Sequence, residues 1–236
     1  MTNLSYIGSE LKLFREAYNW KAYWSSLIRA YIGAEVLEVG AGIGGTTEVL
    51  CKGDRKRWVC LEPDPMLASI LNCSIIKDYL SECCEVKIGT LLDLDREDMF
   101  NSIIYIDVLE HIKNDRAETR LAASHLRDGG FLIVLVPSHQ WLFTPFDRAI
   151  GHYRRYNKKM LSAIIPETVE CVSLRYLDSI GLLASLGNRL ILKSKMPSRK
   201  QILFWDRVMV PLSRKLDPLF QYSLGKSLLG IWRKQV

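Results

Sequence analysis

The sequence lacks the residue spacing of a structural metal site and of a disulfide framework. None of its six cysteines belongs to a C-x-x-C pair, and its four histidines are scattered along the chain. Zinc-binding domains and small disulfide-rich domains both depend on regular spacing of these residues. We therefore expect reduced thiols and no bound metal ion.

A long apolar run is absent as well. No segment has the roughly 18 continuous apolar residues of a membrane span, and none has the layout of a secretory signal. With 48% hydrophobic and 25% charged residues, the composition is ordinary for a globular protein. We expect a cytoplasmic protein whose 236 residues form one domain.

Acidic residues are scarce in one part of the chain. Between positions 189 and 215, eight lysine and arginine residues stand against a single acid, Asp206, and the whole chain carries a net charge of +6. Such an excess can attract nucleic acid or an anionic membrane surface. We expect no nucleic-acid partner. A substrate cap, a dimer face and a peripheral contact with a membrane or a lipid-linked substrate stay open for this region.

The stretch from Val36 to Thr47, VLEVGAGIGGTT, changes from an apolar strand to a glycine turn and then to a helix start. Its β-branched apolar residues are typical of a strand covered on both faces. The four glycines remove side chains where the backbone turns sharply and approaches a ligand. The free N–H groups at the helix start point back at that ligand. We therefore expect a phosphate- or nucleoside-sized ligand at this turn.

Glu38 narrows the choice of ligand. Gly40, Gly42 and Gly45 also spell G-x-G-x-x-G, the fingerprint of dinucleotide-binding enzymes. A carboxylate two residues before the first glycine would repel a pyrophosphate, but it would hold an ammonium group. An adenosine ligand that bears an amino acid meets this demand.

The pattern E-x-G-x-G-x-G resembles motif I of the class I S-adenosylmethionine (SAM) methyltransferases. This resemblance implies SAM as the cofactor and S-adenosylhomocysteine as its product. It also implies cofactor contacts from Glu38, Gly40, Ala41 and Gly42.

Two later segments extend the resemblance around the adenosine. Glu62 lies about 20 residues beyond the turn, where such folds place a carboxylate on the ribose hydroxyls. EPDPML, which begins at Glu62, resembles motif II, and this places Pro63 beside the adenine. After a predicted strand at 85–88, Thr90 and Leu91 are expected to line the adenine, although the acid that many relatives have near this place is missing.

A third segment concerns the methionine end of the cofactor. SIIYI at 102–106 reads as a buried strand and runs straight into DVLEHI. This string resembles motif IV of the family. The resemblance implies that Asp107, Val108 and His111 flank the methionine end of SAM.

Strands and helices alternate along the chain, which indicates an α/β protein with a parallel sheet and right-handed crossovers. With the resemblance, the expected architecture is a Rossmann-like class I methyltransferase fold. Its sheet is mostly parallel and seven-stranded, with an antiparallel last strand and helical insertions, in a single domain over residues 1–236. Strands are predicted at 36–39, 58–61, 85–88, 102–106, 131–136, 169–176 and 226–234.

Helices are predicted around this core from apolar spacing and caps. One or two helices span 9–31, and Asn19 is the expected cap of the second. Asn114 caps a helix that runs to Leu126 and is stopped by Asp128-Gly129-Gly130. Residues from about 182 to 220 form two apolar-faced helices, separated by Met196-Pro197-Ser198, that contribute to substrate or partner recognition.

The segment 138–157 leaves the C-terminal end of the fifth strand, where open α/β sheets bind ligands. It is polar, aromatic and basic, so we expect a lid over the transferred methyl group. GHYRRY at 151–156 resembles a segment of bacterial SAM methyltransferases that are often associated with sugar, polysaccharide or lipid-linked pathways.

His152 is the first candidate for a catalytic base, because an imidazole accepts a proton near neutral pH. Asp147 could orient it or bind a substrate hydroxyl. The two residues could equally serve only to hold the lid in place, and His111 and His139 remain alternative bases. Two guanidiniums of the segment could hold a phosphate or carboxylate. The expected substrate contacts are Trp141, Tyr153, Arg154 and Arg155.

We therefore predict a SAM-dependent methyltransferase that acts on a small-molecule acceptor, with a hydroxyl of a sugar, lipid-linked or natural-product substrate preferred. An NAD(P)-dependent oxidoreductase would share the glycine turn and Glu62. Two observations argue against an oxidoreductase. Tyr156 is not followed by a lysine four positions later, as the Tyr-x-x-x-Lys catalytic pair requires, and Glu38 does not suit a pyrophosphate. A non-catalytic binding module would keep the fold without SAM, but the intact glycines and both acids argue against it.

Overall fold

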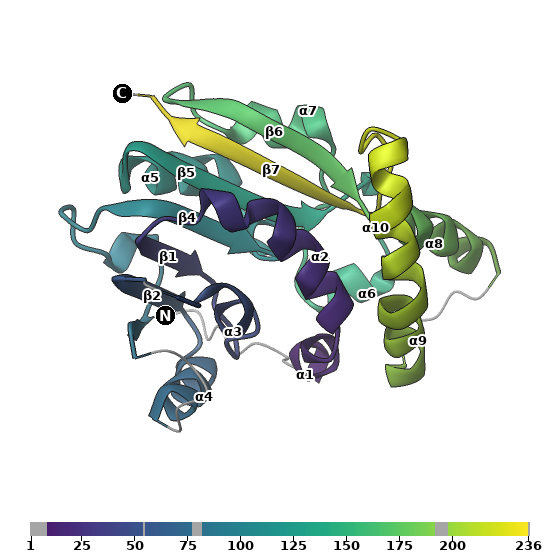
Figure 1. The fold of residues 1–236 in the computed structure, drawn as a ribbon, viewed down its shortest axis with the longest axis horizontal. Helices are drawn as coiled ribbons and strands as arrows, with labels where there is room; N and C mark the ends of the chain where they lie inside the picture. The colour runs from purple at the N-terminus through teal and green to yellow at the C-terminus, as the bar shows by residue number, and fades with distance from the viewer. Residues whose placement is uncertain (1–8, 54, 77–81, 192–197, 236) are drawn as a thin grey trace.

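A seven-stranded sheet runs through the computed structural model, which describes residues 9–53, 55–76, 82–191 and 198–235 (Figure 1). The strand order is β3-β2-β1-β4-β5-β7-β6. Neighbours from β3 to β5 are parallel, and β7 is antiparallel to both of its neighbours. The predicted fold is confirmed. The strands are β1 Glu35–Val39, β2 Arg57–Glu62, β3 Cys84–Ile88, β4 Phe100–Ile106, β5 Leu126–Pro137, β6 Val169–Leu177 and β7 Ser227–Lys234.

Helices cover both faces of the sheet, because successive strand residues point to opposite sides. In β1, Val36 belongs to one buried core and Leu37 to the other. The first core includes residues of α2 (Tyr18–Ile28), α3 (Thr47–Leu50), α4 (Pro65–Ile76) and α10 (Val210–Leu219). The second includes residues of α5 (Asp115–Ser124) and α7 (Lys158–Ile164).

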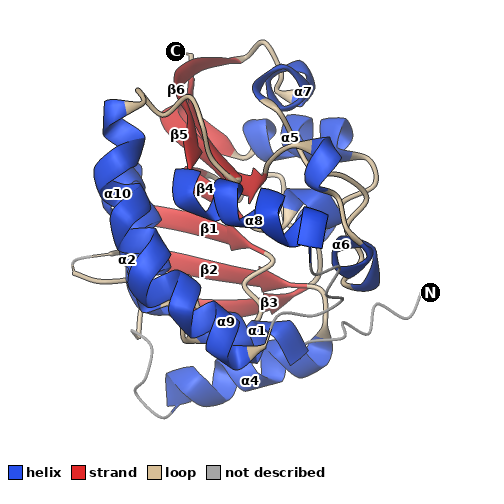
Figure 2. Ribbon diagram, turned by 90° about the vertical axis from the view of Figure 1, so that its right-hand side faces the viewer, coloured by secondary structure: helices blue, strands red, loops and turns tan. Residues whose placement is uncertain are grey.

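Further helices gather at the edge where the parallel strands end, which faces the viewer in Figure 2. They are α1 (Ser9–Arg15), α6 (Pro145–Ala149), α8 (Ser179–Ile191) and α9 (Arg199–Phe204). Ligands of open α/β sheets bind at this edge. The fold therefore brings the segment 138–157 and part of the predicted insertion to the place where a ligand is expected.

The fifth strand begins earlier than predicted. β5 starts at Leu126, where the sequence predicted the end of a helix. Its ladder with β4 shifts register between Phe100 and Ser102, so residues 127–130 form a bulge. A Cβ at Gly130 would lie 2.8 Å from the carbonyl oxygen of Arg127, which explains the glycine there. Asp128-Gly129-Gly130 is thus a bulge within a strand and not a helix stop.

The predicted insertion at about 182–220 is helical. α8 comes first, and α9 continues through a π-helical turn, η5 (Trp205–Met209), into α10. Ser198 and Gln201 form a capping box at the start of α9. Met196 and Pro197 of the predicted break lie outside the described residues.

The N-terminus of α2 is capped from the far end of the chain. Ala17 stands at the cap position without a side-chain hydrogen bond, and Asn19 lies inside the helix. The buried Asp206 carboxylate of η5 accepts hydrogen bonds from the backbone N–H of Asn19 at 3.2 Å and of Trp20 at 2.8 Å. The prediction that Asn19 caps this helix is therefore wrong. The contact joins the insertion to the N-terminal helices.

Asp206→Ala should lower the free energy of unfolding by about 1.5–3 kcal/mol, because it removes a buried charged acceptor and a helix cap. Urea denaturation followed by circular dichroism measures the change. Lys215→Ala, at an exposed position of α10, is the control and should change stability by less than about 0.5 kcal/mol. An Asp206→Ala protein as stable as the wild type would show that α2 does not depend on this cap.

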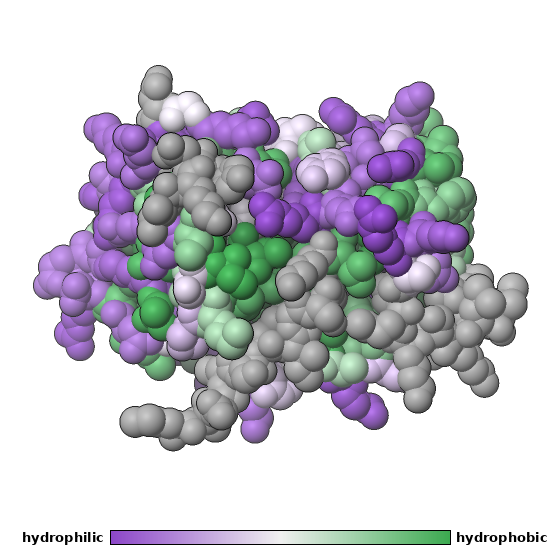
Figure 3. Space-filling model, turned by 90° about the horizontal axis from the view of Figure 1, so that it is seen from below, coloured by the Kyte–Doolittle hydropathy of each residue, from purple (hydrophilic) through white to green (hydrophobic). Residues whose placement is uncertain are grey.

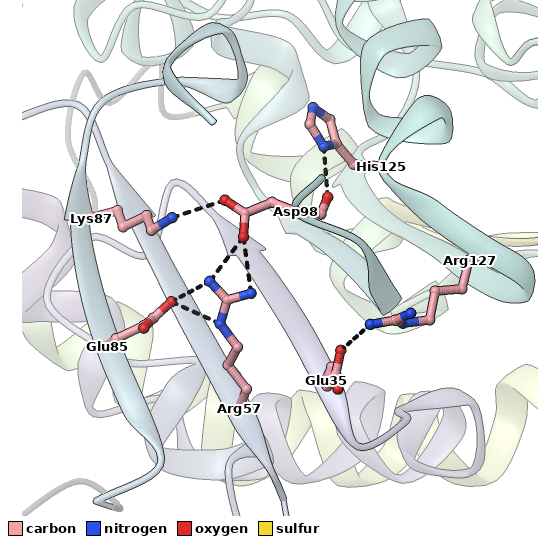
Figure 4. A network of polar contacts seen from close by, with 7 residues as sticks. All are labelled: Glu35, Arg57, Glu85, Lys87, Asp98, His125 and Arg127. Atoms are coloured by element: carbon pink, nitrogen blue, oxygen red, sulfur yellow. Dashed lines mark hydrogen bonds and ion pairs between the residues drawn. The ribbon is translucent and has the colours of Figure 1, made fainter. Parts of the chain in front are cut away.

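Ion pairs connect several strands of the sheet (Figure 4). Arg57 of β2 donates to Glu85 at 2.7 Å and to Asp98 at 3.0 Å. Lys87 of β3 donates to the second oxygen of Asp98 at 2.9 Å. Nδ1 of His125 lies 2.8 Å from the Asp98 carbonyl oxygen. Asp98, which precedes β4, is thus the shared acceptor of the network.

The charge of Asp98 makes this network sensitive to acid. Partial burial raises the pKa of Asp98, but hydrogen bonds from Lys87 and Arg57 outweigh that effect and hold the pKa below its ordinary value. The folded protein therefore binds this proton less readily than the unfolded chain does. The stabilisation is present at neutral pH and is lost as the pH falls through the ordinary aspartate range.

Asp98→Asn should reduce stability at pH 7, and its difference from the wild type should shrink as the pH falls below about 4. Urea unfolding at several pH values measures both quantities. Asp95→Asn, at an exposed position nearby, serves as the control. A difference between wild type and Asp98→Asn that stayed constant with pH would contradict the role of the carboxylate charge.

Hydrophobic side chains reach the surface in places. The face seen in Figure 3 carries them among hydrophilic ones, and α4 lies on this side of the molecule. Met66 of α4 is 76% exposed. Among the described residues, no helix is long and apolar enough to cross a membrane. Peripheral contact with a membrane stays a prediction.

Candidate active site

The glycine turn follows β1 at the carboxyl edge of the sheet. Gly40, Gly42 and Gly44 have positive φ angles of 66°, 57° and 82°, which side chains with a Cβ disfavour. A Cβ at Gly40 would lie 2.7 Å from a methyl carbon of Val108. The backbone N–H groups of Gly40 and Ala41 both donate to the Leu61 carbonyl oxygen. The structure thus brings together the turn and the first residues after β4, as the sequence predicted.

Glu62 closes the turn from the neighbouring strand. One oxygen of its buried carboxylate accepts the Gly42 N–H at 2.7 Å, and the other accepts the Asp64 N–H at 3.0 Å. Burial raises the pKa of Glu62, and the two backbone hydrogen bonds oppose that effect. A carboxylate has about four acceptor positions, so further hydroxyl donors can be accommodated. Glu62 is therefore suited to hold a ribose while it shapes the loop.

Glu38 is buried behind the turn. One oxygen accepts hydrogen bonds from the Thr47 hydroxyl at 2.7 Å and from the Trp58 indole at 2.8 Å. The other oxygen has no hydrogen-bond partner among the described residues. Burial raises the pKa of Glu38 to about 7. The carboxylate thus ties β1 to α3 and β2, and its contact with an ammonium group stays a prediction.

The loop after β3 carries the expected adenine contacts. Thr90 is exposed, and both its N–H and its hydroxyl donate to Asp93, which forms a capping box for η2 (Leu91–Asp93). Leu91 is buried, whereas Leu92 is 83% exposed. Pro63 is partly exposed at the end of β2. The Thr90 hydroxyl is engaged by the protein itself, so an adenine contact there must share it.

Asp107 stands directly after β4 in the left-handed region, with a φ of 55°. Asp107 is accessible to solvent, but protein atoms crowd around its carboxyl group and exclude part of the water that would solvate it. These surroundings raise the pKa of Asp107 to about 6, although His152, Lys226 and Arg155 act in the opposite direction. A strained backbone and an accessible carboxyl at this edge are typical of a functional position.

Asp147 is the centre of the segment 138–157. Its buried carboxylate accepts from the Thr144 N–H and hydroxyl, both at 2.7 Å, in a capping box at the start of α6. It also accepts from Arg155 Nε at 2.9 Å and faces His152 Nδ1 at 3.0 Å. Burial raises the pKa of Asp147, but the hydrogen bonds and the Arg155 charge outweigh it and depress the pKa strongly. The carboxylate therefore contacts His152 directly, and its roles in orienting a base or binding a substrate hydroxyl stay predictions.

Glu110 and His111 of η3 (Leu109–His111) lie close to His152 of the segment 138–157. His152 Nε2 lies 3.7 Å from Glu110 Oε1, and the rings of His111 and His152 are 4.5 Å apart in an edge-to-face contact. Burial and the His152 charge lower the pKa of His111 to about 4. Burial, with the Asp107 charge, raises the pKa of Glu110 well above its usual range. These three residues could hold a metal ion.

The expected substrate contacts divide into two groups. Trp141 and Tyr153 are 44% and 54% exposed and can meet a ligand. Arg154 donates to Asp115 and to two backbone carbonyl groups, and Arg155 holds Asp147 in a two-pronged contact. Both guanidiniums thus have structural partners, and their substrate role stays a prediction.

His139, one of the two alternative bases, lies at the start of the same segment. It has a φ of 65°, and its ring stacks on Trp141 and Tyr176. Burial lowers the pKa of His139. Its Nε2 has no hydrogen-bond partner among the described residues. The stacked ring supports the exposed Trp141.

Sequence reasoning missed three features of this region. Glu110 lies in the DVLEHI string but was not an expected site residue, because only the packed structure shows that its carboxylate is buried without a hydrogen bond to the described residues. Lys226 lies 3.8 Å from Asp178 and over the Trp205 ring, and burial lowers its pKa. The third feature is a group of thiols that could hold a metal ion, which cysteine spacing did not reveal: Cys51, Cys83 and Cys84.

A family model described as a methyltransferase domain matches residues 17–181, which is more than half of the chain. The chain belongs to the methyltransferase domain family. The prediction of a class I SAM-dependent methyltransferase is confirmed, and the oxidoreductase alternative is set aside. The methyltransferase does contain a Tyr-x-x-x-Lys spacing at Tyr222 and Lys226, which the sequence reading overlooked. These side chains have other partners, Arg175 over the Tyr222 ring and Trp205 under Lys226.

Solved structures share the fold of this methyltransferase at low sequence identity. Coclaurine N-methyltransferase bound to N-methylheliamine and S-adenosylhomocysteine has a TM-score of 0.63 and 15% identity, over 92% of this chain and 72% of that one. A SAM-dependent methyltransferase from Clostridium acetobutylicum has a TM-score of 0.60 and 11% identity, over 94% and 93%. The [4+2]-cyclase SpnF has a TM-score of 0.63 and 14% identity, over 98% of this chain and 95% of that one. No curated protein matches the chain. The subgroup suggested by GHYRRY stays a prediction.

Proposed function

We propose that this methyltransferase transfers the methyl group of SAM to a hydroxyl of a small molecule, such as a sugar, a lipid-linked compound or a natural product. The observation that carries the proposal is the Glu62–Gly42 hydrogen bond of 2.7 Å, which locks the glycine turn against a buried carboxylate. An adenosine fits this arrangement, because the carboxylate suits ribose hydroxyls and the turn lets the backbone approach. Gly40, Ala41 and Gly42 would line the cofactor.

When bound, SAM supplies a methyl group on a positively charged sulfur; the acceptor oxygen gains this methyl and loses its proton, and the sulfur becomes a neutral thioether. The protein must hold the acceptor oxygen in line and provide for its proton. Asp107 and Val108 follow β4 beside the glycine turn and would border the reacting end of the cofactor. The segment 138–157 would cover the acceptor, with Trp141 and Tyr153 as exposed contacts.

His152 is proposed to act on the acceptor as one member of a cluster. Its Nδ1 is taken by Asp147, and its Nε2 is directed toward Glu110. The side chain is only 9% exposed, so it is not an isolated imidazole open to solvent. Glu110, His111 and His152 together would therefore hold the acceptor hydroxyl and assist the loss of its proton.

The insertion is proposed to complete the acceptor site. Asp178 and Trp205, which contact Lys226, belong to the β6–α8 junction and to η5. Lys226 also influences Asp107 electrostatically. The helices α8 to α10 thus reach the region of the reacting groups, and their exposed basic residues suit an acceptor that bears a phosphate or carboxylate.

Glu62→Ala should weaken SAM binding by about 1.5–3 kcal/mol, because a charged hydrogen-bond acceptor is lost. Isothermal titration calorimetry of the purified protein with SAM, S-adenosylhomocysteine and NAD measures the affinities. Glu62→Gln keeps the shape of the side chain and separates charge from loop geometry. Glu118→Gln is the control, because Glu118 accepts a hydrogen bond from Tyr105 on the face of the sheet that α5 and α7 cover. Unchanged SAM affinity in Glu62→Ala, or tight binding of NAD by the wild type, would refute the assignment.

His152→Ala should lower kcat by about 10²–10⁴ while the SAM affinity stays close to that of the wild type. The reason is that the imidazole is proposed to serve the acceptor and not the cofactor. Methyl transfer to a panel of hydroxylated acceptors, with SAM titrations in parallel, gives both quantities. A higher KM with unchanged kcat would instead show that His152 only orders the segment 138–157.

A further inference from the structure

The buried carboxylate of Glu110 makes no hydrogen bond to the described residues. The residue has no exposed surface. Its own backbone carbonyl accepts from the Tyr153 N–H, so the residue is fixed in place. A buried carboxylate is tolerated when it is protonated, paired or bound to a metal ion. Its surroundings decide between these states.

Two imidazoles stand beside this carboxylate. His152 Nε2 lies 3.7 Å from Glu110 Oε1, and His111 contacts the His152 ring edge-to-face. One ligand atom from each of the three residues lies within 4.8 Å of the others. Two ligand atoms bound to one ion at about 2.1 Å each lie at most about 4.2 Å apart, so the present separations are close to this limit or slightly beyond it. Small side-chain movements would therefore bring all three atoms to one ion.

We propose that Glu110, His111 and His152 bind a divalent transition-metal ion, such as Zn²⁺, Fe²⁺ or Mn²⁺. Two histidines and one carboxylate are the ligand set of catalytic zinc sites and of non-haem iron sites, which leave coordination positions open. Mg²⁺ prefers oxygen ligands and fits this set poorly.

Asp147 supplies an independent argument for this site. Its Oδ1 lies 3.0 Å from His152 Nδ1, which fixes the ring so that Nε2 faces Glu110. Thr144 and Arg155 hold the carboxylate of Asp147 in turn. Histidines that bind metal ions almost always make such a second contact through the other ring nitrogen. If His152 only supported the segment 138–157, its Nε2 would not need to face a carboxylate that has no hydrogen bond to the described residues.

The metal site rests on the proposed methyl transfer and defines its acceptor further. A cation with open positions would bind the acceptor through oxygen, orient it and make its hydroxyl easier to deprotonate. The acceptor class is therefore a hydroxyl compound whose oxygen can coordinate a metal ion. The ion would lie next to Asp107, which is close enough to His152 to feel its charge.

Calorimetric titration of the full-length, chelator-treated protein with Zn²⁺, Mn²⁺ and Mg²⁺ tests the site. Zn²⁺ and Mn²⁺ should each bind at one equivalent per Glu110–His111–His152 cluster, and Mg²⁺ should bind much more weakly. Glu110→Gln and His111→Asn should each weaken Mn²⁺ binding at least tenfold. Asp147→Asn should weaken it about 10–100-fold. Thermal melting with and without metal shows which variants are folded, and His111→Asn keeps the test valid if Glu110→Gln does not fold.

The cysteine group of Cys51, Cys83 and Cys84 requires a matched control, because it could also bind zinc. Cys84→Ser should leave Mn²⁺ binding unchanged. With Co²⁺ as the probe, absorption in the visible range without a thiolate charge-transfer band should appear in Cys84→Ser and be lost in Glu110→Gln.

The results separate this proposal from the proposed function. SAM binding without Mn²⁺ or Zn²⁺ binding at the cluster would overturn the metal site and leave methyl transfer intact. Metal binding without SAM binding would do the reverse. Equal metal affinity in wild type and Glu110→Gln would also overturn the site, and would mean that Glu110 is simply protonated.

Discussion

The buried carboxylate of Asp147 is the contact on which the candidate active site depends. It caps α6 through Thr144, holds the Arg155 guanidinium and faces His152 Nδ1. A charge that is removed from water needs several partners, and here the partners are the side chains that shape the segment 138–157. The same bond fixes which nitrogen of His152 faces Glu110. The same carboxylate therefore both holds the segment 138–157 together and orients the His152 imidazole.

Buried carboxylates also join the insertion to the sheet. Asp217 accepts from the Tyr23 hydroxyl at 2.8 Å and from the Asp178 N–H at 2.8 Å, which links α10, α2 and the end of β6. The Asp178 carbonyl oxygen accepts from the Lys226 N–H, and the Lys226 carbonyl oxygen accepts from the Ser138 N–H. The Asp217 side chain and two backbone hydrogen bonds thus connect the insertion to the first residue of the segment 138–157.

Local patterns allowed the strands, the glycine turn and the cap at Asn114 to be predicted from the sequence, because each depends on residues close together in the chain. The cap of α2 could not be predicted in this way, since Asp206 lies 187 positions from Asn19. Glu110 was missed for a related reason. The absence of a partner for a buried side chain is a property of the packed structure, and no residue spacing records it.

The position of Glu110 is hard to explain by stability alone. A hydrophobic residue of similar size would avoid the desolvation of a carboxylate, as replacements of buried charges elsewhere show. Asp147 is equally buried, but contacts with three side chains offset the desolvation of its carboxylate. The oxygens of Glu110 accept no hydrogen bond from the described residues. The proposed metal ion would supply the partner that this carboxylate lacks among the described residues. Glu110 lies two residues after Val108, whose side chain packs against Gly40 of the glycine turn, so an ion held by Glu110 would belong to the same region as the proposed methyl transfer.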